Sequence, residues 1–441
     1  MSFDFAQDET TFNFAPCAFK MHRIRTFLSN SFPALASRDF AIFWVGHLLS
    51  LIGTAMQNTA QPLLAYRLSG RPFDLGLIGF ALTLPTFFLA LPGGVLIEHW
   101  DKRKTIIILQ IVMMLDAFIL AYLTLSGTIQ IWQIIALALV LGIATAFEIT
   151  ARQAMLIELV GRASLPNAIA LQSTAFNVAR VLGPSFTAVL LLAFPKNGEG
   201  WIFLLNGISF ITIIIGLLFV HTRYKENLAP VTKSLFNEML DGQKYIARTA
   251  SVGMIILLAA IMGLFAFPIS QQIPVLSKDI LAAINDTKTS VDTRNSALYT
   301  AQGVGALIAA FMIVINNSER WRGTRLILGE AFFIIGLLGL ALVHSLWPAL
   351  ILIAFMGWGS VTQLATMNTL LQLQIPNELR GRVFSVYLWA LQGVAPIGSL
   401  LIGWMTQQWG LSTTATICGL TCLITMGSIQ VFRPGVRKSE G

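Results

Sequence analysis

The chain has 441 residues, of which 55% are hydrophobic and only 11% are charged. Soluble proteins carry about 25% charged residues, and the mean hydropathy here is +0.73. This composition argues against a soluble enzyme or a nucleic-acid-binding protein and predicts an all-α protein that crosses a lipid bilayer several times. The net charge of +8 does not indicate nucleic acid, because the basic residues lie in short loops between apolar runs.

A helix that crosses a bilayer needs about 20 apolar residues, and the chain contains twelve such runs. Six runs predict a first half over 40–220, and six predict a second half over 251–432. The predicted spans are 40–66, 75–97, 105–126, 131–150, 166–194, 201–220, 251–275, 297–316, 324–344, 346–366, 383–406 and 411–432.

Three polar segments flank or separate these halves. Residues 1–39 contain no cleavable signal pattern and predict an N-terminal tail, with Met1 and Met21 both candidates for the start. Residues 433–441 predict a second tail. The linker 221–250 predicts an amphipathic helix on the membrane surface, because its apolar residues recur at helical spacing: Leu235, Phe236, Met239, Leu240 and Ile246.

Lys and Arg residues fix the expected orientation. The tails and loops on one side of the predicted spans hold 22 of them, and those on the other side hold 6. Loops rich in Lys and Arg stay in the cytoplasm. The sequence therefore predicts a multi-pass protein of the plasma or inner membrane with both termini in the cytoplasm.

Weak repeats relate the two predicted halves. Gly94 and Gly305 are 211 positions apart, and Gly183-Pro184 and Ala395-Pro396 are 212 apart. A near-constant offset indicates two six-helix pseudo-repeats. Many secondary transporters are built in this way, with a site at mid-depth between the repeats.

The loop between the second and third spans carries the most specific motif. It reads "GGVLIEHWDKRK" over 93–104 and contains Gly94, Glu98, Asp101, Lys102, Arg103 and Lys104. The stretch resembles the loop 2–3 signature of the major facilitator superfamily. Further stretches, among them "FLLNGISF" and "IPNELRGRVFSVY", are similar to the enterobactin-exporter-like transmembrane secretion effector branch. The resemblance covers about 38–432 and implies a twelve-helix major facilitator fold.

The resemblance also implies that the second helix packs against the eleventh. Gly94 would allow close approach. Glu98, together with Asp101, would then face the helix start near Val383, whose partial positive charge favours carboxylates. Arg380 and Arg382 lie just before that start. We expect a cytoplasmic latch there. The alternative is that Lys102, Arg103 and Lys104 only anchor the loop in the cytoplasm.

Charges inside a bilayer are costly and mark functional candidates. Asp116 and Arg180 fall near mid-depth, and Glu148 lies near the inner end of its span. Asp116 and Glu148 are the candidates for proton coupling. The alternative is a permanent ion pair, either between Asp116 and Arg180 or between Glu148 and Arg152, whose spacing of four residues permits contact on a helix.

Uncharged polar residues in the spans predict a substrate cavity. His47, Gln57, Asn58, Gln61 and Asn177 are its candidate residues, and hydrogen bonds between helices are the alternative explanation. The fifth span adds Arg180, Gly183 and Pro184. Proline there predicts a kink, and the Gly-Pro pair resembles the antiporter signature of superfamily exporters.

These features together predict a secondary active exporter of siderophore- or drug-like small molecules. We expect a proton gradient as its energy source, no cofactor or metal, a monomer, and the small molecule and the bilayer as its partners. A lipid or lysolipid flippase is the alternative within transport, and a membrane sensor is the alternative outside it. An enzyme is not expected, because no nucleophile elbow, HExxH or nucleotide-binding glycine loop is present.

Overall fold

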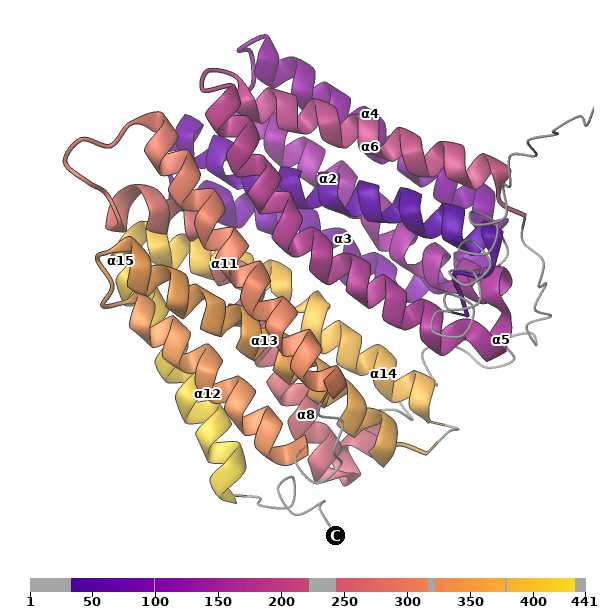
Figure 1. Ribbon diagram of the computed structural model, residues 1–441. Coiled ribbons are helices and arrows are strands. Elements are labelled where there is room, and N and C mark those ends of the chain that lie inside the picture. Colours follow the sequence, from indigo (N-terminus) through magenta and orange to yellow (C-terminus); the bar gives the residue numbers. More distant parts are fainter. Residues whose placement is uncertain (1–32, 99, 222–242, 316–321, 377–378, 433–441) are drawn as a thin grey trace, which may run out of the picture.

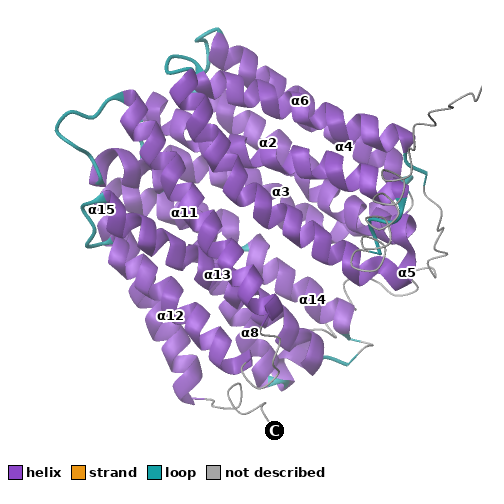
Figure 2. Cartoon of the chain, in the orientation of Figure 1, coloured by secondary structure: helices purple, strands orange, loops and turns teal. Residues whose placement is uncertain are grey.

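A computed structural model describes residues 33–98, 100–221, 243–315, 322–376 and 379–432. Within these ranges the chain is helical apart from short turns (Figure 2). The predicted tail 1–39 therefore lies almost wholly outside the described residues, as do the tail 433–441 and most of the predicted linker helix. Of that linker, residues 243–248 are helical.

The first half consists of five long helices, drawn in indigo to magenta in Figure 1. They are α2 (Arg38–Ser69), α3 (Pro72–Glu98), α4 (Lys102–Leu125), α5 (Ile131–Ala193) and α6 (Gly198–Phe219). Helix α2 packs against α5 and α6, α3 packs against α5, and α4 packs against α6. These contacts bring the helices into one bundle on one side of the molecule.

The second half forms the neighbouring bundle, in salmon to yellow (Figure 1). It begins with α8 (Ala250–Ile261), the π-helix η1 (Met262–Ala266), α9 (Phe267–Ser270), α10 (Ile273–Val275) and the π-helix η2 (Leu276–Ile280). It continues with α11 (Lys288–Ile315), α12 (Arg322–Leu340), α13 (Leu346–Gln374), α14 (Arg380–Leu388), the π-helix η4 (Trp389–Gly393) and α15 (Ala395–Phe432). Helix α13 packs against both α11 and α12.

Local sequence signals set several helix ends. The Ser37 side chain accepts a hydrogen bond from the Phe40 amide at the start of α2, and Gly70 ends that helix with φ 63°. Only glycine adopts this left-handed backbone without strain. Helix α5 starts with a capping box, in which the side chains of Gln130 and Gln133 each bond to the other residue's backbone amide.

Two helices continue where the sequence predicts separate spans. Helix α5 runs through the predicted loop 151–165 and departs from helical backbone only at Gly161 (φ 69°). Helix α15 likewise runs through the predicted gap between the spans 383–406 and 411–432 and departs from helical backbone at Gly410 (φ 79°). The residues after 150, which the sequence predicts as a loop, are therefore helical, because this stretch is rich in good helix formers such as alanine, leucine and arginine.

Within the described residues, ten helical segments are long and apolar enough to cross a bilayer. Two of them, Ile131–Ala193 with 63 residues and Arg382–Thr425 with 44, are about three times and about twice as long as one crossing requires. The all-helical fold is thus confirmed. The number of twelve crossings stays a prediction that requires each of these two segments to cross twice.

The outer faces of the bundles are apolar. Large side chains there are exposed in the isolated chain, with Tyr122 at 71% and Trp347 at 77%. A soluble protein does not expose apolar surface on this scale. These faces therefore require lipid around them. Trp132 and Trp201, near helix starts, and Trp409, next to the break at Gly410, are also exposed, as expected of interfacial tryptophans.

The two halves meet along two helix crossings. Helix α3 packs against α15, where a Cβ atom on Gly403 would lie 2.9 Å from Gly76 Cα. Helix α5 packs against α11, where a Cβ atom on Gly303 would overlap the Arg180 carbonyl oxygen. Side chains at these glycines would push the helices apart, so the crossings are fixed contact points between the halves.

Candidate functional site

Two adjacent cavities lie between the halves, with volumes of about 270 and 440 Å³. Helices α2 and α5 of the first half line the smaller cavity, together with η1, α9, α11 and α13 of the second. The larger cavity is lined by α2, α3 and α5 of the first half and by α9, α11, η4 and the first residue of α15 of the second. The two cavities share Asn58, Phe176, Phe267, Ser270 and Tyr299. Since each half supplies part of the wall, relative movement of the halves would change the shape of the site.

Two π-helical segments form part of the wall. Met262 and Ala266 of η1 line the smaller cavity, and Gln392 of η4 lines the larger one. A π-turn adds a residue to the helical repeat and rotates the side chains that follow. Such segments often occur at functional sites. The two segments also contact each other, because Gly263 packs against the backbone at Leu391.

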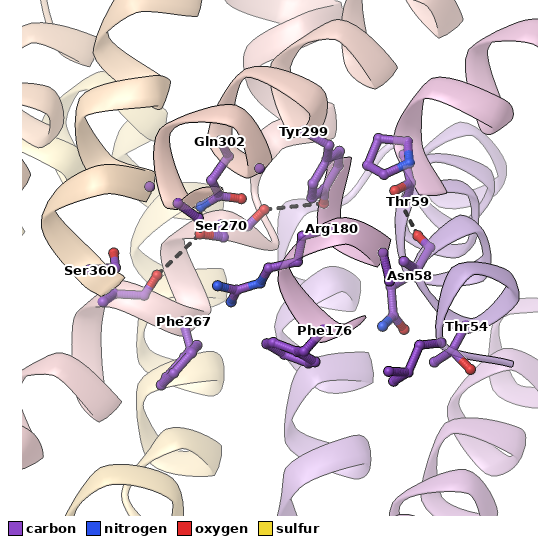
Figure 3. A pocket seen from close by; sticks show the side chains of 18 of the residues that line it. Thr54, Asn58, Thr59, Phe176, Arg180, Phe267, Ser270, Tyr299, Gln302 and Ser360 are labelled. Carbon is purple, nitrogen blue, oxygen red and sulfur yellow. Dashed lines mark hydrogen bonds between the residues drawn. The ribbon is translucent and has the colours of Figure 1, made fainter. Parts of the chain in front are cut away.

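The second-half wall is tied together by hydrogen bonds around Ser270. The Tyr299 hydroxyl donates to the Ser270 carbonyl oxygen at 3.2 Å. The Gln302 side-chain nitrogen donates to the Ser270 hydroxyl at 2.8 Å. Figure 3 shows these bonds as dashed lines. They fix the orientation of Gln302, and so leave its amide oxygen as a defined acceptor beside the cavity.

Arg180 is the charged residue of the site. Its side chain extends from α5 into the space between Phe176, Phe267 and Gln302 (Figure 3). The guanidinium carbon lies 4.9 Å from the centre of the Phe176 ring, which is a cation–π contact. Among the described residues that line the two cavities, Arg180 alone carries a charge.

Four residues that the sequence singles out line the cavities: Asn58, Gln61, Arg180 and Pro184. Gly183, next to Pro184, instead packs against α2, and a Cβ atom there would lie 2.5 Å from Ala55 Cβ. The predicted motif of the fifth span thus divides into one residue that joins two helices and two that face the cavity.

The other three predicted cavity residues lie elsewhere. His47 is buried and stacks on Phe43 with ring centres 5.6 Å apart. The Gln57 amide donates to Gln61 at 3.1 Å and accepts from Asn206 at 2.7 Å. Asn177 donates to its own helix, at the Ser173 carbonyl oxygen. Gln57 therefore takes part in hydrogen bonding between helices, which was the alternative to a cavity role, through its bond with Asn206 of α6.

Sequence reasoning missed the second-half wall. Phe267, Ser270, Tyr299, Gln302 and Ser360 are ordinary residues in membrane spans, and none carries a charge. The one available signal was the polar run "SQQ" at 270–272, inside an otherwise apolar stretch. It pointed to a break in the helix, and the structure has a turn at 271–272.

The buried carboxylates have different surroundings. Glu148 forms an ion pair with Arg152 at 2.9 Å, as the spacing of four residues allowed. Asp116 is 2% exposed, and its Oδ1 atom has no hydrogen-bond partner. Between described residues, Asp116 and Arg180 form no ion pair. An intramembrane carboxyl in this situation is a candidate for carrying a proton.

The loop between α3 and α4 holds several structural contacts. Asp101 caps α4 by accepting from the Lys104 amide at 3.0 Å. Arg103 donates to the carbonyl oxygens of Leu217 and Leu218 at the end of α6. These bonds satisfy exposed helix ends. We call this end of the molecule the Asp101 end.

The remaining basic residues of that loop also have defined surroundings. Lys102 lies 3.6 Å from Glu158 of α5, and Lys104 is exposed. The predicted latch falls outside what the structure describes, which covers neither the Glu98 and Arg380 side chains nor the surroundings of Gly94. The Arg382 side chain does have an interaction partner.

The opposite end, which we call the Arg67 end, carries a partly buried ionic network between the halves. Arg67 of α2 bonds to Glu199 of α6 in its own half and to Asp292 of α11 in the other. Lys288 of α11 lies 3.4 Å from Glu199 and donates to the Pro195 carbonyl oxygen at 2.8 Å. Between described residues, the hydrogen bonds and ion pairs that join the halves gather toward this end.

Further contacts stabilise the second-half part of this end. The Tyr66 hydroxyl donates to Asp279, which adds another bond between the halves. Arg294 of α11 forms a two-fold pair with Asp286 in the loop before that helix, at 2.9 and 2.6 Å. The Arg294 hydrogen bond holds the pKa of the Asp286 carboxyl at about 2, with the Ala283 amide as a further donor.

The comparisons with known proteins decide the family. The sequence pattern of the transmembrane secretion effectors matches residues 29–440. The chain belongs to this family. Transmembrane secretion effectors are transporters of the major facilitator superfamily, which confirms the resemblance drawn from the loop between α3 and α4. The protein is accordingly a multi-pass membrane protein.

Relatives of the chain are exporters or transporters by name. It is 21% identical to the multidrug efflux pump Tap of Mycolicibacterium fortuitum, over 88% of this chain and 94% of that protein. It is 25% identical to the staphyloferrin A transporter of Staphylococcus aureus, over 80% and 86%. It is 23% identical to the enterobactin exporter EntS of Salmonella choleraesuis, over 89% and 94%.

Solved structures confirm the fold. The nucleoside transporter NupG superposes with a TM-score of 0.68 at 10% identity, covering 88% of this chain and 99% of that one. A bacterial homologue of the human lysosomal transporter Spinster superposes with a TM-score of 0.63 at 13% identity, covering 89% and 95%. At such low identity the likeness concerns the fold alone.

Proposed function

We propose that the protein is a secondary active exporter of small molecules that works by alternating access. The observation that carries this proposal is the pair of cavities between the halves, walled by both and closed by ionic bonds toward the Arg67 end. The family and the named activities of the relatives support export. In this proposal the Asp101 end faces the cytoplasm of a plasma or inner membrane, and one chain suffices for transport.

The cargo enters from the Asp101 end and leaves when the Arg67 end opens. Opening breaks the contacts of Arg67 and Lys288 with the other half, while the crossings at Gly76 and Gly303 serve as contact points between the moving halves. The mixed wall of aromatic rings, amides and hydroxyls suits a bulky cargo with polar groups, such as a siderophore or an amphiphilic drug.

A proton gradient supplies the energy, and no cofactor is required. Asp116 is the better of the two predicted proton sites, because it has no ion-pair partner among the described residues while Glu148 is bonded to Arg152. A carboxyl that is already paired gains less by taking up a proton.

The test uses purified protein in proteoliposomes with an imposed pH gradient, and efflux from deletion and overexpressing cells across dyes, antibiotics and siderophores. Gradient-driven transport should vanish in Asp116→Asn, while exchange of cargo across the membrane without a gradient persists. Glu148→Gln serves as the matched control and should keep both. Efflux that ignores a protonophore would refute the proton-driven step. Lysolipid accumulation in the deletion strain with normal tolerance of drugs would favour a flippase instead.

A further inference from the structure

The charge of the central cavities restricts what they can bind. Arg180 places a guanidinium among apolar walls, and no described residue lining either cavity is an Asp, Glu or Lys. A guanidinium stays protonated in proteins. The described walls of the site therefore carry a positive charge that no acidic side chain of these walls balances.

The carboxylates of Asp116 and Glu148, both buried in the first half, do not neutralise this charge. Glu148 is held by Arg152. Asp116 lines neither cavity and forms no ion pair with Arg180. The contact of the guanidinium within the site is the ring of Phe176, whose attraction for a cation is weaker than that of a carboxylate. An unbalanced charge in a membrane interior is costly, and a bound anion would remove that cost.

The geometry of the site suits one class of anion. A guanidinium is planar and can bind the two oxygens of a carboxylate or phosphate at once. Phe176 and Phe267 flank it from both halves, and Phe176 is 50% exposed although it lies between the bundles (Figure 3). The rings offer faces for stacking, and Asn58 and Gln302 offer polar atoms around them.

We propose that the cavities bind amphiphilic molecules with an anionic oxygen group, which Arg180 holds while Phe176 and Phe267 pack against the apolar or aromatic part. This inference rests on the proposed function, since it names the cargo class of the same site. The position of Arg180 supports it further. Its backbone lies at the α5–α11 crossing beside Gly303, so an anion there would be held where the halves meet.

Binding of two dyes with the same xanthene ring and opposite charge tests the proposal. Fluorescein is an anion with a carboxylate at pH 8, and rhodamine 123 is a cation with an ester in its place. The purified protein in detergent, titrated under fluorescence anisotropy, should bind fluorescein more tightly. Arg180→Gln should weaken fluorescein binding by about 10- to 150-fold, since a hydrogen bond to a charged group contributes about 1.5–3 kcal/mol. Arg180→Lys should fall between.

Two controls separate a local site from a general charge effect. Arg71→Gln removes an exposed arginine on the turn between α2 and α3 and should leave fluorescein binding unchanged. Rhodamine 123 binding should not weaken in Arg180→Gln, which also shows that the variant is folded. If Arg180→Gln cannot be purified, the dye preference of the wild-type protein and the Arg180→Lys variant still decide the matter.

The outcomes discriminate clearly. The proposal would be overturned if Arg180→Gln weakened the binding of both dyes equally. It would also be overturned if the wild-type protein bound rhodamine 123 as tightly as fluorescein, or bound neither dye. Displacement of fluorescein by lysophosphatidylglycerol, but not by lysophosphatidylcholine, would identify a lipid headgroup as the anion; no displacement by either would identify a free small molecule. Binding needs no gradient, so a failure of proton-driven export with fluorescein binding intact would refute the proposed function alone.

Discussion

The ion pair between Arg67 and Asp292 gives the sharpest test of the closed Arg67 end. Asp292 is 1% exposed and is the acid through which Arg67 reaches the second half. Asp292→Asn keeps the shape of the side chain and removes its charge. Arg67 keeps its ion pair with Glu199, which lies in the same half. The substitution therefore weakens the link between the halves without leaving the arginine unpaired.

The expected magnitude follows from the kind of bond. A hydrogen bond between charged groups contributes about 1.5–3 kcal/mol, which corresponds to a change of about 10- to 150-fold in the ratio of closed to open molecules. Other links persist, among them the bonds of Lys288 with Glu199 and of Tyr66 with Asp279, and the close packing of Gly76 on Gly403. The Arg67 end should therefore open more often without staying open.

Distances between the halves are the measurement. Spin labels on Thr128→Cys, in the turn between α4 and α5, and on Leu342→Cys, in the turn between α12 and α13, mark the two halves at exposed sites of this end. The three native cysteines are replaced by serine. Double electron–electron resonance spectroscopy should then show a larger fraction of long distances between the two labels in Asp292→Asn than in the protein without this substitution.

A matched control lies in the same region. Asp286→Asn removes an acid of equal size whose partner, Arg294, belongs to the same half. It should leave the distances unchanged. An unaltered distance distribution in Asp292→Asn, or an equal shift in both variants, would refute the view that the Arg67 network holds the halves together.

Three further predictions concern single contacts. Asp101→Ala removes the N-cap of α4 and should lower stability by about 1 kcal/mol, measured by thermal unfolding in detergent, with Asp101→Asn recovering most of it. Gly303→Val should abolish transport and lower the melting temperature because its side chain overlaps α5, whereas Gly427→Val, with open space around it, should do neither. Because the pKa of Asp286 is lowered to about 2, its pairing with Arg294 is fully present above about pH 4 and is lost as the pH falls through 2. Hydrogen exchange in 281–287, corrected for intrinsic rates, should therefore rise over that range in the wild type but not in Asp286→Asn.

The helices could be predicted from apolar runs because a bilayer demands them at a nearly fixed length. The residues at which the helices end were harder to predict. The predicted loop 151–165 is helical, since the stretch is made of good helix formers and buries an apolar face with Met155, Leu156 and Leu159. Only Gly161 interrupts it. The π-helical segments η1 and η4 leave no composition signal, because a π-turn arises from packing between helices.

Only the first-half wall of the site could be predicted from the sequence. A polar residue in an apolar span is conspicuous, and Asn58, Gln61 and Arg180 were recognised in this way. Whether such a residue faces a cavity depends on the rotation of its helix. His47 meets these criteria equally well, yet it lies buried against Phe43. The cavity wall of the second half was not predicted, because serines and phenylalanines are common throughout membrane helices. Only the folded structure shows that these residues line one cavity.

The separation of Asp116 from Arg180 constrains how an exporter of this design would couple proton and cargo. Asp116 lies on α4 and lines neither cavity, whereas Arg180 lies on α5 within one. Proton and cargo must alternate for coupling to be tight, and two ligands at one site exclude each other by direct competition. In the proposed scheme the proton site at Asp116 and the cargo site at Arg180 are separate. Their mutual exclusion must then pass through the arrangement of the helices, and the glycine crossings at Gly303 and Gly403 are where the halves can transmit it. Gly403 packs on Gly76, away from both binding groups, whereas Gly303 packs directly on the Arg180 backbone.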